Sequence, residues 1–104
     1  MTGKTRVTSK FQVRDVVGEV ASGFPDVRAV GLFGSFSRDE QDDASDVDLL
    51  VALKPTTSYS TYAGLKERLQ DELGRPVDLL TSLDGLAPFF KEELRRDMVR
   101  IYEL

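Results

Sequence analysis

The chain of 104 residues contains neither cysteine nor histidine. Without cysteine there is no disulfide and no thiolate chemistry, a composition that fits a reducing cytosol. Without histidine the chain lacks the usual general base of enzymes, which excludes catalytic triads and histidine-based ribonuclease sites. Catalysis by this chain must therefore depend on carboxylates and metal.

The chain also lacks long apolar runs and an excess of positive charge. Its longest apolar run is far shorter than the about 20 residues of a membrane-spanning helix, and no signal peptide opens it. We therefore expect a cytoplasmic protein that does not use a membrane. The net charge of −4 argues against strong nucleic-acid binding, and so against a polymerase or an RNA binder.

Length and hydrophobic periodicity predict one α/β (α+β) domain, with a small mixed sheet of three to four strands flanked by helices. Residues 1–8 are polar and are expected to form a flexible N-terminus, and residues 9–104 form the domain. Ser9 is a helix N-cap, Gly74 a C-cap, and Pro88 a first helical residue. At 99–102 a strand is favoured over a continued helix. The predicted helices are 9–22, 60–73 and one from 88, and the predicted strands are 27–33, 47–53, 76–81 and 99–102.

The most informative stretch lies between two predicted strands. Gly34-Ser35 follows the first, ten residues intervene, and Asp46-x-Asp48 leads into the second. Glycine allows close approach of the backbone to a ligand, and Ser35 can donate to phosphate oxygens. In a strand, Asp46 and Asp48 project from one face with Cα atoms roughly 6.5 Å apart, which suits a shared Mg²⁺ ion. The pattern indicates a phosphate site beside a metal site.

Acidic residues crowd this stretch. Arg38 is their one nearby opposite charge, and such a cluster repels itself unless a cation intervenes. For Asp39 to Asp43 we favour a solvated loop, whereas Asp46 and Asp48 lie where the chain enters the core. Ser35 to Gln41 is expected to form a short helical turn whose N-terminus favours a phosphate. The acids are at positions 39, 40, 42, 43, 46 and 48.

The spacing Gly34-Ser35-x10-Asp46-x-Asp48 resembles the signature of the nucleotidyltransferase superfamily that includes DNA polymerase beta. The short chain is similar to its minimal nucleotidyltransferase (MNT) branch over residues 13–102. The resemblance implies a nucleotidyltransferase fold, nucleotide contacts from Gly34, Ser35 and Arg38, and catalytic, metal-binding aspartates at 46 and 48.

The superfamily carries a third carboxylate on a later strand, which this resemblance places at Asp78. Asp78 interrupts the apolar residues Val77 and Leu79, so a buried partner such as a metal is better supported than an edge-strand residue facing water. In the superfamily the first two carboxylates hold the nucleotide metal and the third activates the attacking hydroxyl. That two-metal arrangement implies two Mg²⁺ ions, with ATP as the nucleotide donor.

The resemblance implies a function as well as a fold. MNT proteins commonly act as antitoxins that add AMP to a tyrosine of a HEPN ribonuclease toxin, so a HEPN-type partner is expected. Members often read Gly-Ser-Arg-x-Arg-Gly, whereas this chain has Phe36 and Asp39 at the outer positions. These departures leave open a catalytically weak binding module that neutralises its partner by contact. A small-molecule nucleotidyltransferase is a third possibility, which the short length disfavours.

Overall fold

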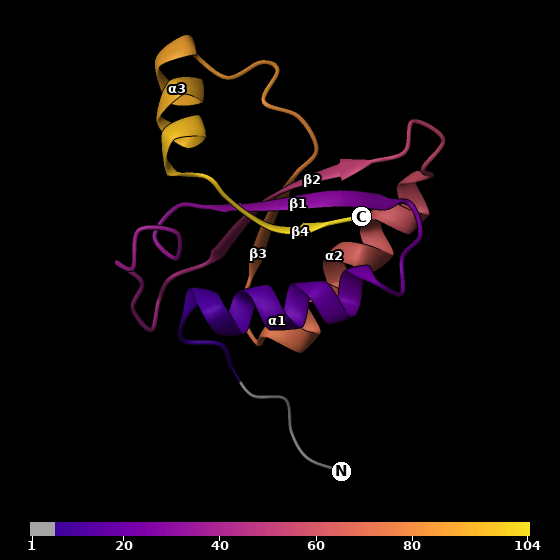
Figure 1. Ribbon diagram of the computed structural model, residues 1–104, viewed down its shortest axis with the longest axis horizontal. Coiled ribbons are helices and arrows are strands. Elements are labelled where there is room, and N and C mark those ends of the chain that lie inside the picture. Colours follow the sequence, from indigo (N-terminus) through magenta and orange to yellow (C-terminus); the bar gives the residue numbers. More distant parts are fainter. Residues whose placement is uncertain (1–5) are drawn as a thin grey trace.

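A computed structural model describes residues 6–104. Its elements are α1 (Lys10–Ala21), β1 (Val27–Phe33), β2 (Val47–Leu53), α2 (Tyr59–Leu73), β3 (Val77–Leu80), α3 (Pro88–Asp97) and β4 (Val99–Glu103). The four strands form one mixed sheet in the order β3-β2-β1-β4 (Figure 1). β1 runs antiparallel to both β2 and β4, while β2 and β3 are parallel. The predicted α/β architecture is confirmed.

The helix ends follow the capping residues of the sequence. The hydroxyl oxygens of Ser9 and Ser58 each accept a hydrogen bond from the backbone N–H three residues on, at the starts of α1 and α2. Gly74 ends α2 with a φ of 70°, in the left-handed region that glycine adopts without strain. Met98 is extended, with φ −71° and ψ 133°, so α3 stops there and the predicted last strand, β4, follows.

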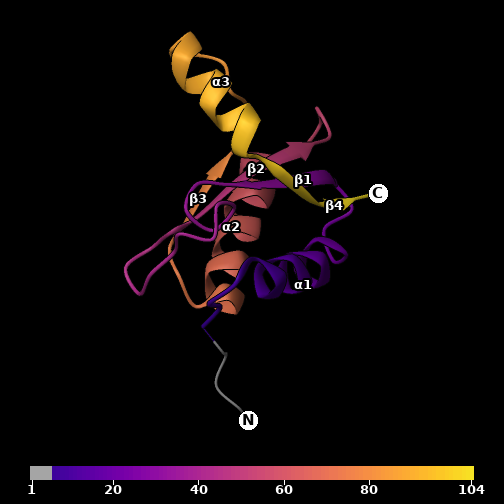
Figure 2. The same ribbon diagram turned by 60° about the vertical axis from the view of Figure 1, so that its left-hand side comes forward.

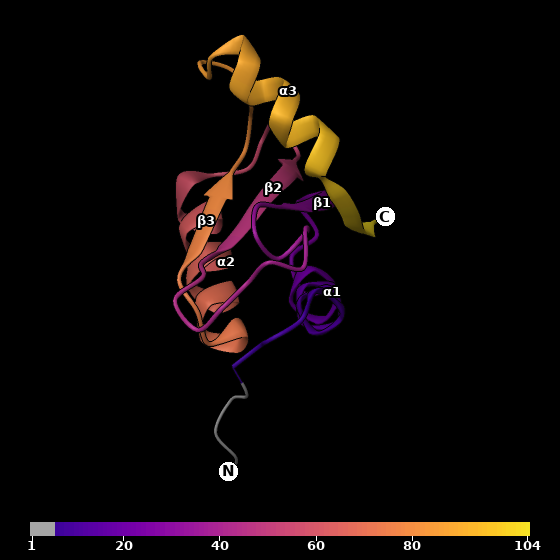
Figure 3. The same ribbon diagram turned by 90° about the vertical axis from the view of Figure 1, so that its left-hand side faces the viewer.

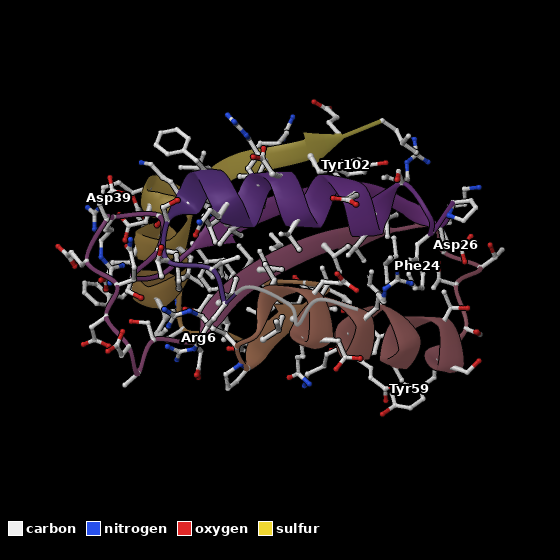
Figure 4. All side chains as sticks on the ribbon, turned by 90° about the horizontal axis from the view of Figure 1, so that it is seen from below. Arg6, Phe24, Asp26, Asp39, Tyr59 and Tyr102 are labelled. Carbon is white, nitrogen blue, oxygen red and sulfur yellow. The ribbon has the colours of Figure 1, made fainter. Side chains whose placement is uncertain are left out.

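One face of the sheet is covered by α1 and α2. In the view from below, these two helices lie side by side in front of the sheet (Figure 4). They enclose the hydrophobic core between themselves and the strands. The Tyr62 hydroxyl of α2 donates to the Leu79 carbonyl of β3 at 2.7 Å. The strand residues buried in this core include Val30, Leu32, Val47, Leu49, Val51, Val77 and Leu79.

The opposite face of the sheet is left uncovered by α1 and α2. Figures 2 and 3 show α3 on this side, standing away from the strands except where it runs into β4. Leu94 is the one buried residue of α3. No helix among residues 6–104 is long and apolar enough to cross a membrane.

The start of the described chain corrects part of the sequence expectation. Residues 1–5 of the expected flexible N-terminus lie outside the described residues. Val7, however, is 2% exposed, and its N–H donates to the Leu73 carbonyl at 3.0 Å. The segment at Val7 is therefore packed on the fold, because an apolar side chain and a free backbone donor both find partners at the end of α2.

Candidate active site

Two of the predicted carboxylates meet on the uncovered face. Asp48 is the second residue of β2, Asp78 is the second residue of β3, and the two are direct partners in the parallel register. Asp78 is exposed on the edge strand β3, so the expectation that it is buried was wrong. Paired positions on neighbouring strands lie about 4.8 Å apart, so the two side chains leave the sheet together. Asp46 is exposed and lies one residue before β2, two positions from Asp48. The sheet thus pairs Asp48 with Asp78, and Asp46 lies beside them in the chain, just before β2.

The proximity of these charges alters the ionisation of Asp48. Partial burial raises the pKa of its carboxyl group to about 6, and repulsion from Asp78 and then Asp46 contributes in the same direction. The positive charge of Arg38 opposes this rise. A cation bound beside Asp48 would offset this burial and repulsion and favour the ionised carboxylate.

Gly34 brings the Gly-Ser turn into direct contact with these carboxylates. Its φ is 76°, and a Cβ atom at this position would overlap the Asp48 Oδ2 atom and lie 3.0 Å from its Cγ. Only glycine fits, both because of the backbone conformation and because the Asp48 carboxylate occupies the space of a side chain. The two halves of the sequence motif therefore form one site.

The segment after Gly34 forms a short series of turns that ends at Asp39, two residues before the end of the helical turn predicted for 35–41. The N–H groups of Ser37, Arg38 and Asp39 each donate to the carbonyl three residues earlier, at 3.1, 3.2 and 3.4 Å. Asp39 then takes a φ of 58°, which ends any helical path, and its carboxylate pairs with Lys10 of α1 at 3.2 Å. The N–H group of Ser35 takes no part in this series, which leaves it available to a phosphate group.

The two departures from the family pattern have different structural explanations. Asp39 occupies the left-handed conformation in which glycine would be the unstrained residue. Phe36 is fully buried in the core, so its side chain has no access to a nucleotide. The phenylalanine therefore acts as a hydrophobic anchor that holds the turn onto the sheet.

Arg75 is a residue of this region that sequence reasoning missed. It is 4% exposed, and its guanidinium carbon lies 4.9 Å from the centroid of the Phe36 ring. Its Nε donates to the Val7 carbonyl at 2.7 Å, and its Nη1 donates to the carbonyls of Asp42 and Ser45 at 2.9 and 2.7 Å. Burial, and then the neighbouring Arg6, lower the pKa of Arg75. It connects the turn to the loop that presents Asp46.

Arg38, the predicted phosphate contact, is already engaged in ion pairs. Its Nε pairs with Glu40 at 3.0 Å and its Nη1 with Asp97, the last residue of α3, at 3.1 Å. The hydrogen bonds to these two carboxylates raise the pKa of Arg38. The ion pair between Arg38 and Asp97 connects the end of α3 to the turn after Gly34. For Arg38 to contact a phosphate, it would have to leave Glu40 or Asp97.

A cavity of about 410 Å³ lies where α3 faces the carboxylates. Its volume falls within the about 300 to 1,000 Å³ of small-molecule sites. Sequence reasoning did not predict that α3 forms one of its walls, because nothing local to 88–97 indicates which surface the helix covers. Lining residues from the sheet and turn are Phe33, Gly34, Arg38, Asp48, Asp78 and Leu80, and those from the α3 region are Leu86, Phe90, Glu93, Leu94 and Asp97.

The residues present fit a divalent cation only in part. Within residues 6–104 no three acidic side chains are close enough together to form a complete set of metal ligands. Mg²⁺, however, is usually held by one or two carboxylates together with substrate phosphates and water. The in-register pair of Asp48 and Asp78, with the raised pKa of Asp48, matches that donor chemistry.

Comparison with known proteins agrees with this geometry. The family model described as "Polymerase beta, Nucleotidyltransferase" matches residues 17–104. The protein named "Putative protein adenylyltransferase MJ1379", from Methanocaldococcus jannaschii, is 35% identical over 77 residues, which are 72% of this chain and 77% of that protein. A solved structure described as "putative minimal nucleotidyltransferase" is 34% identical, covers 88% of this chain and 95% of its own, and has a TM-score of 0.70.

A more distant structure shares the fold alone. It is the complex of a tri-AMPylated Shewanella oneidensis HEPN toxin with an MNT antitoxin. Its matching chain is 18% identical, with 93% of this chain and 74% of that chain covered and a TM-score of 0.62.

Proposed function

The chain belongs to the Polymerase beta nucleotidyltransferase family, and from that premise we propose that it moves AMP from ATP to a hydroxyl group of a partner protein. The acceptor is a tyrosine of a HEPN-type ribonuclease toxin, and the modification makes this chain its antitoxin in the cytoplasm. The observation that carries the proposal is the register of Asp48 against Asp78, with Gly34 packed on the Asp48 carboxylate.

Each site residue has a task in this reaction. The N–H and hydroxyl groups of Ser35 donate to phosphate oxygens, and Arg38 adds a positive charge after leaving Asp97. Asp48 and Asp78, with Asp46 beside them, would hold Mg²⁺, as two ions shared with the phosphates of ATP. When bound, Mg²⁺ neutralises charge on the phosphates and lowers the pKa of a bound oxygen nucleophile. Arg75 holds the loop before Asp46 in place.

The transfer exchanges one oxygen–phosphorus bond for another. The acceptor oxygen forms a bond to the α-phosphorus of ATP, the bond from that phosphorus to the bridging oxygen breaks, and pyrophosphate leaves with the electron pair. Asp78 takes the proton of the acceptor hydroxyl. The cavity wall formed by α3 reduces the access of water, which would otherwise compete as the nucleophile.

The comparisons support a protein as the acceptor. The relative named above is described as a protein adenylyltransferase, and the distant complex contains an AMPylated HEPN toxin bound to an MNT antitoxin. The open side of the sheet in this chain gives a bulky acceptor room to approach.

One observation favours a second function, neutralisation by contact without transfer. Arg38 is occupied by Glu40 and Asp97, so the one arginine retained from the family pattern is not free for a phosphate in this structure. In this alternative the chain covers the active surface of its partner and the carboxylate site is inactive.

The test is intact mass spectrometry of the protein encoded next to this chain, co-expressed with it. We expect a mass gain of one or more AMP units with the wild type, and none with Asp78→Asn. Asp71→Asn, an exposed change on α2, is the matched control and preserves the gain. A partner that is neutralised without any change in mass would replace the enzyme proposal with the contact function.

A further inference from the structure

Two adjacent aromatic side chains are exposed on the first turn of α3. Phe89 is 77% exposed and Phe90 is 52% exposed. Single exposed apolar residues are ordinary on protein surfaces, whereas an adjacent pair beside a cavity marks an interaction site. The other large apolar side chains exposed among residues 6–104 are each on a different element or chain end: Phe11, Tyr59, Val99 and Leu104.

The aromatic pair is continuous with the carboxylate cavity. Phe90 lines that cavity together with Asp48 and Asp78, and Leu94, one helical turn later, is the residue that anchors α3. The first turn of α3 therefore lies at the edge of the cavity in which, under the proposed function, the acceptor hydroxyl reaches Asp78. α3 stands clear of the sheet at this end, so its outer side is accessible (Figure 3).

The charges around the cavity favour one kind of acceptor. Four acidic residues line it, two from the sheet (Asp48 and Asp78) and two from α3 (Glu93 and Asp97), whereas Arg38 is the one basic residue among the described lining residues. Glu93 faces this rim without a basic partner among the cavity-lining residues, and Asp97, which pairs with Arg38 at 3.1 Å, joins it once Arg38 turns to a phosphate. A segment with lysine or arginine near its hydroxyl complements this rim, and an acidic segment is repelled by it.

We infer that the first turn of α3, through Phe89 and Phe90, is the docking surface for a basic, tyrosine-bearing segment of a partner protein. The inference rests on the proposed function and adds the chemistry of the acceptor to it. An aromatic ring next to the reacting hydroxyl packs against Phe90, while serine or threonine offers no such surface. Lysine or arginine side chains of the same segment then lie against Glu93 and Asp97.

The test uses two random copolymers as acceptors, poly(Lys,Tyr) and poly(Glu,Tyr), with radiolabelled ATP and Mg²⁺. We expect kcat/KM for poly(Lys,Tyr) to exceed that for poly(Glu,Tyr) by about tenfold or more. The double variant Phe89→Ser/Phe90→Ser raises KM for poly(Lys,Tyr) by about tenfold, with a much smaller change in the Kd of ATP. The conservative Phe89→Leu/Phe90→Leu variant keeps most of the activity because it keeps the apolar surface.

A control variant separates docking from a general loss of surface hydrophobicity. Phe11→Ser changes a phenylalanine of α1 that is 60% exposed and has no part in the cavity, so its KM stays at the wild-type value. Equal use of the two copolymers, or an unchanged KM in the Phe89/Phe90 serine variant, overturns the inference. So does a wild-type dimer, detected by analytical ultracentrifugation, that the serine variant dissociates, since the pair would then bind a second copy of this chain.

Failure of the proposed function is distinguished by direct binding. The fluorescence anisotropy of labelled poly(Lys,Tyr) reports docking whether or not AMP is transferred. Binding that depends on Phe89 and Phe90 without any transfer by the wild type upholds the docking surface and overturns the enzyme proposal.

Discussion

Consecutive residues of β2 alternate between two different surroundings. Val47, Leu49 and Val51 are fully or almost fully buried beneath α1 and α2, whereas Asp48 and Leu50 face the side where α3 leaves a cavity. The first face has no ionisable side chain from this strand. The second face has a half-buried carboxylate whose pKa is raised to about 6.

One face of β2 therefore serves the stability of the fold, and the other face carries the candidate catalytic group. The face packed by two helices supplies the hydrophobic stabilisation of the fold, because its side chains are removed from water. The other face is only partly covered, so it tolerates acidic groups that a closed core would exclude. Substitutions on the two faces should therefore affect different measurements.

The largest expected effect is on transfer, at Asp48. Asp48→Asn withdraws a charged ligand from the centre of the site, and we expect the rate of AMP transfer to fall by about 1,000-fold. Thermal stability without metal stays equal or rises, since the substitution removes repulsion from Asp46 and Asp78. Transfer is measured with labelled ATP, and melting by circular dichroism. Full activity in the variant would remove Asp48 from the metal site.

The next effect tests the buried face through two adjacent leucines. Leu49 is fully buried, and Leu49→Ala should lower the free energy of unfolding by about 3 kcal/mol through lost burial and a residual cavity. Leu50→Ala, on the open face, should cost less than about 1.5 kcal/mol because Leu50 is only partly buried. Urea unfolding measures both variants. Equal losses would show that both faces contribute alike to the core.

Arg75 tests how the loop before Asp46 is held against the buried core. Arg75→Ala leaves the carbonyls of Val7, Asp42 and Ser45 without their donor, and we expect a loss of about 2 kcal/mol in the free energy of unfolding. Arg68→Ala is the matched control. Arg68 is an exposed arginine of α2 that pairs with Glu72 at 3.4 Å, and its loss should be less than about 1 kcal/mol.

The smallest expected effect is the pH dependence of stability. The pKa of Asp48 is raised from 3.8 to about 6 on folding, so its stabilising contribution is fully present below pH 3.8 and is lost as the pH rises through 6. Asp48→Asn cannot ionise. Its melting temperature should therefore exceed that of the wild type by more at pH 7.5 than at pH 4.5. Because the group is about half exposed, we expect this difference to correspond to about 1 kcal/mol. A difference of the opposite sign would contradict the raised pKa.

Strands and helix ends were predictable from the sequence, whereas the form of the turn between Gly34 and Gln41 was less so. The continuous apolar run at 49–53 predicted β2, and Ser9, Gly74 and Pro88 marked helix ends, because each depends on neighbours a few residues away. The helical turn predicted at 35–41 is present as turns over residues 35–39. It is shorter than predicted because Asp39 takes a left-handed conformation, which the local sequence did not indicate.

The residue types of the site and their spacing along the chain follow from the amino-acid sequence alone. With no histidine or cysteine available, Gly34-Ser35 and Asp46-x-Asp48 were the groups able to carry the chemistry, and alternation along a strand placed two carboxylates on one side. These conclusions needed only composition and local backbone geometry.

Contacts between segments that are distant in the chain became known from the folded arrangement. The parallel register sets Asp78 beside Asp48 across 30 residues of sequence, α3 closes a cavity over them, and Arg75 is buried against Phe36. Strand order, helix placement and the burial of a charge depend on packing between elements, because the free energy of each choice comes from contacts between residues that are remote in the chain. Hydrophobic periodicity within one element contains no information about those contacts.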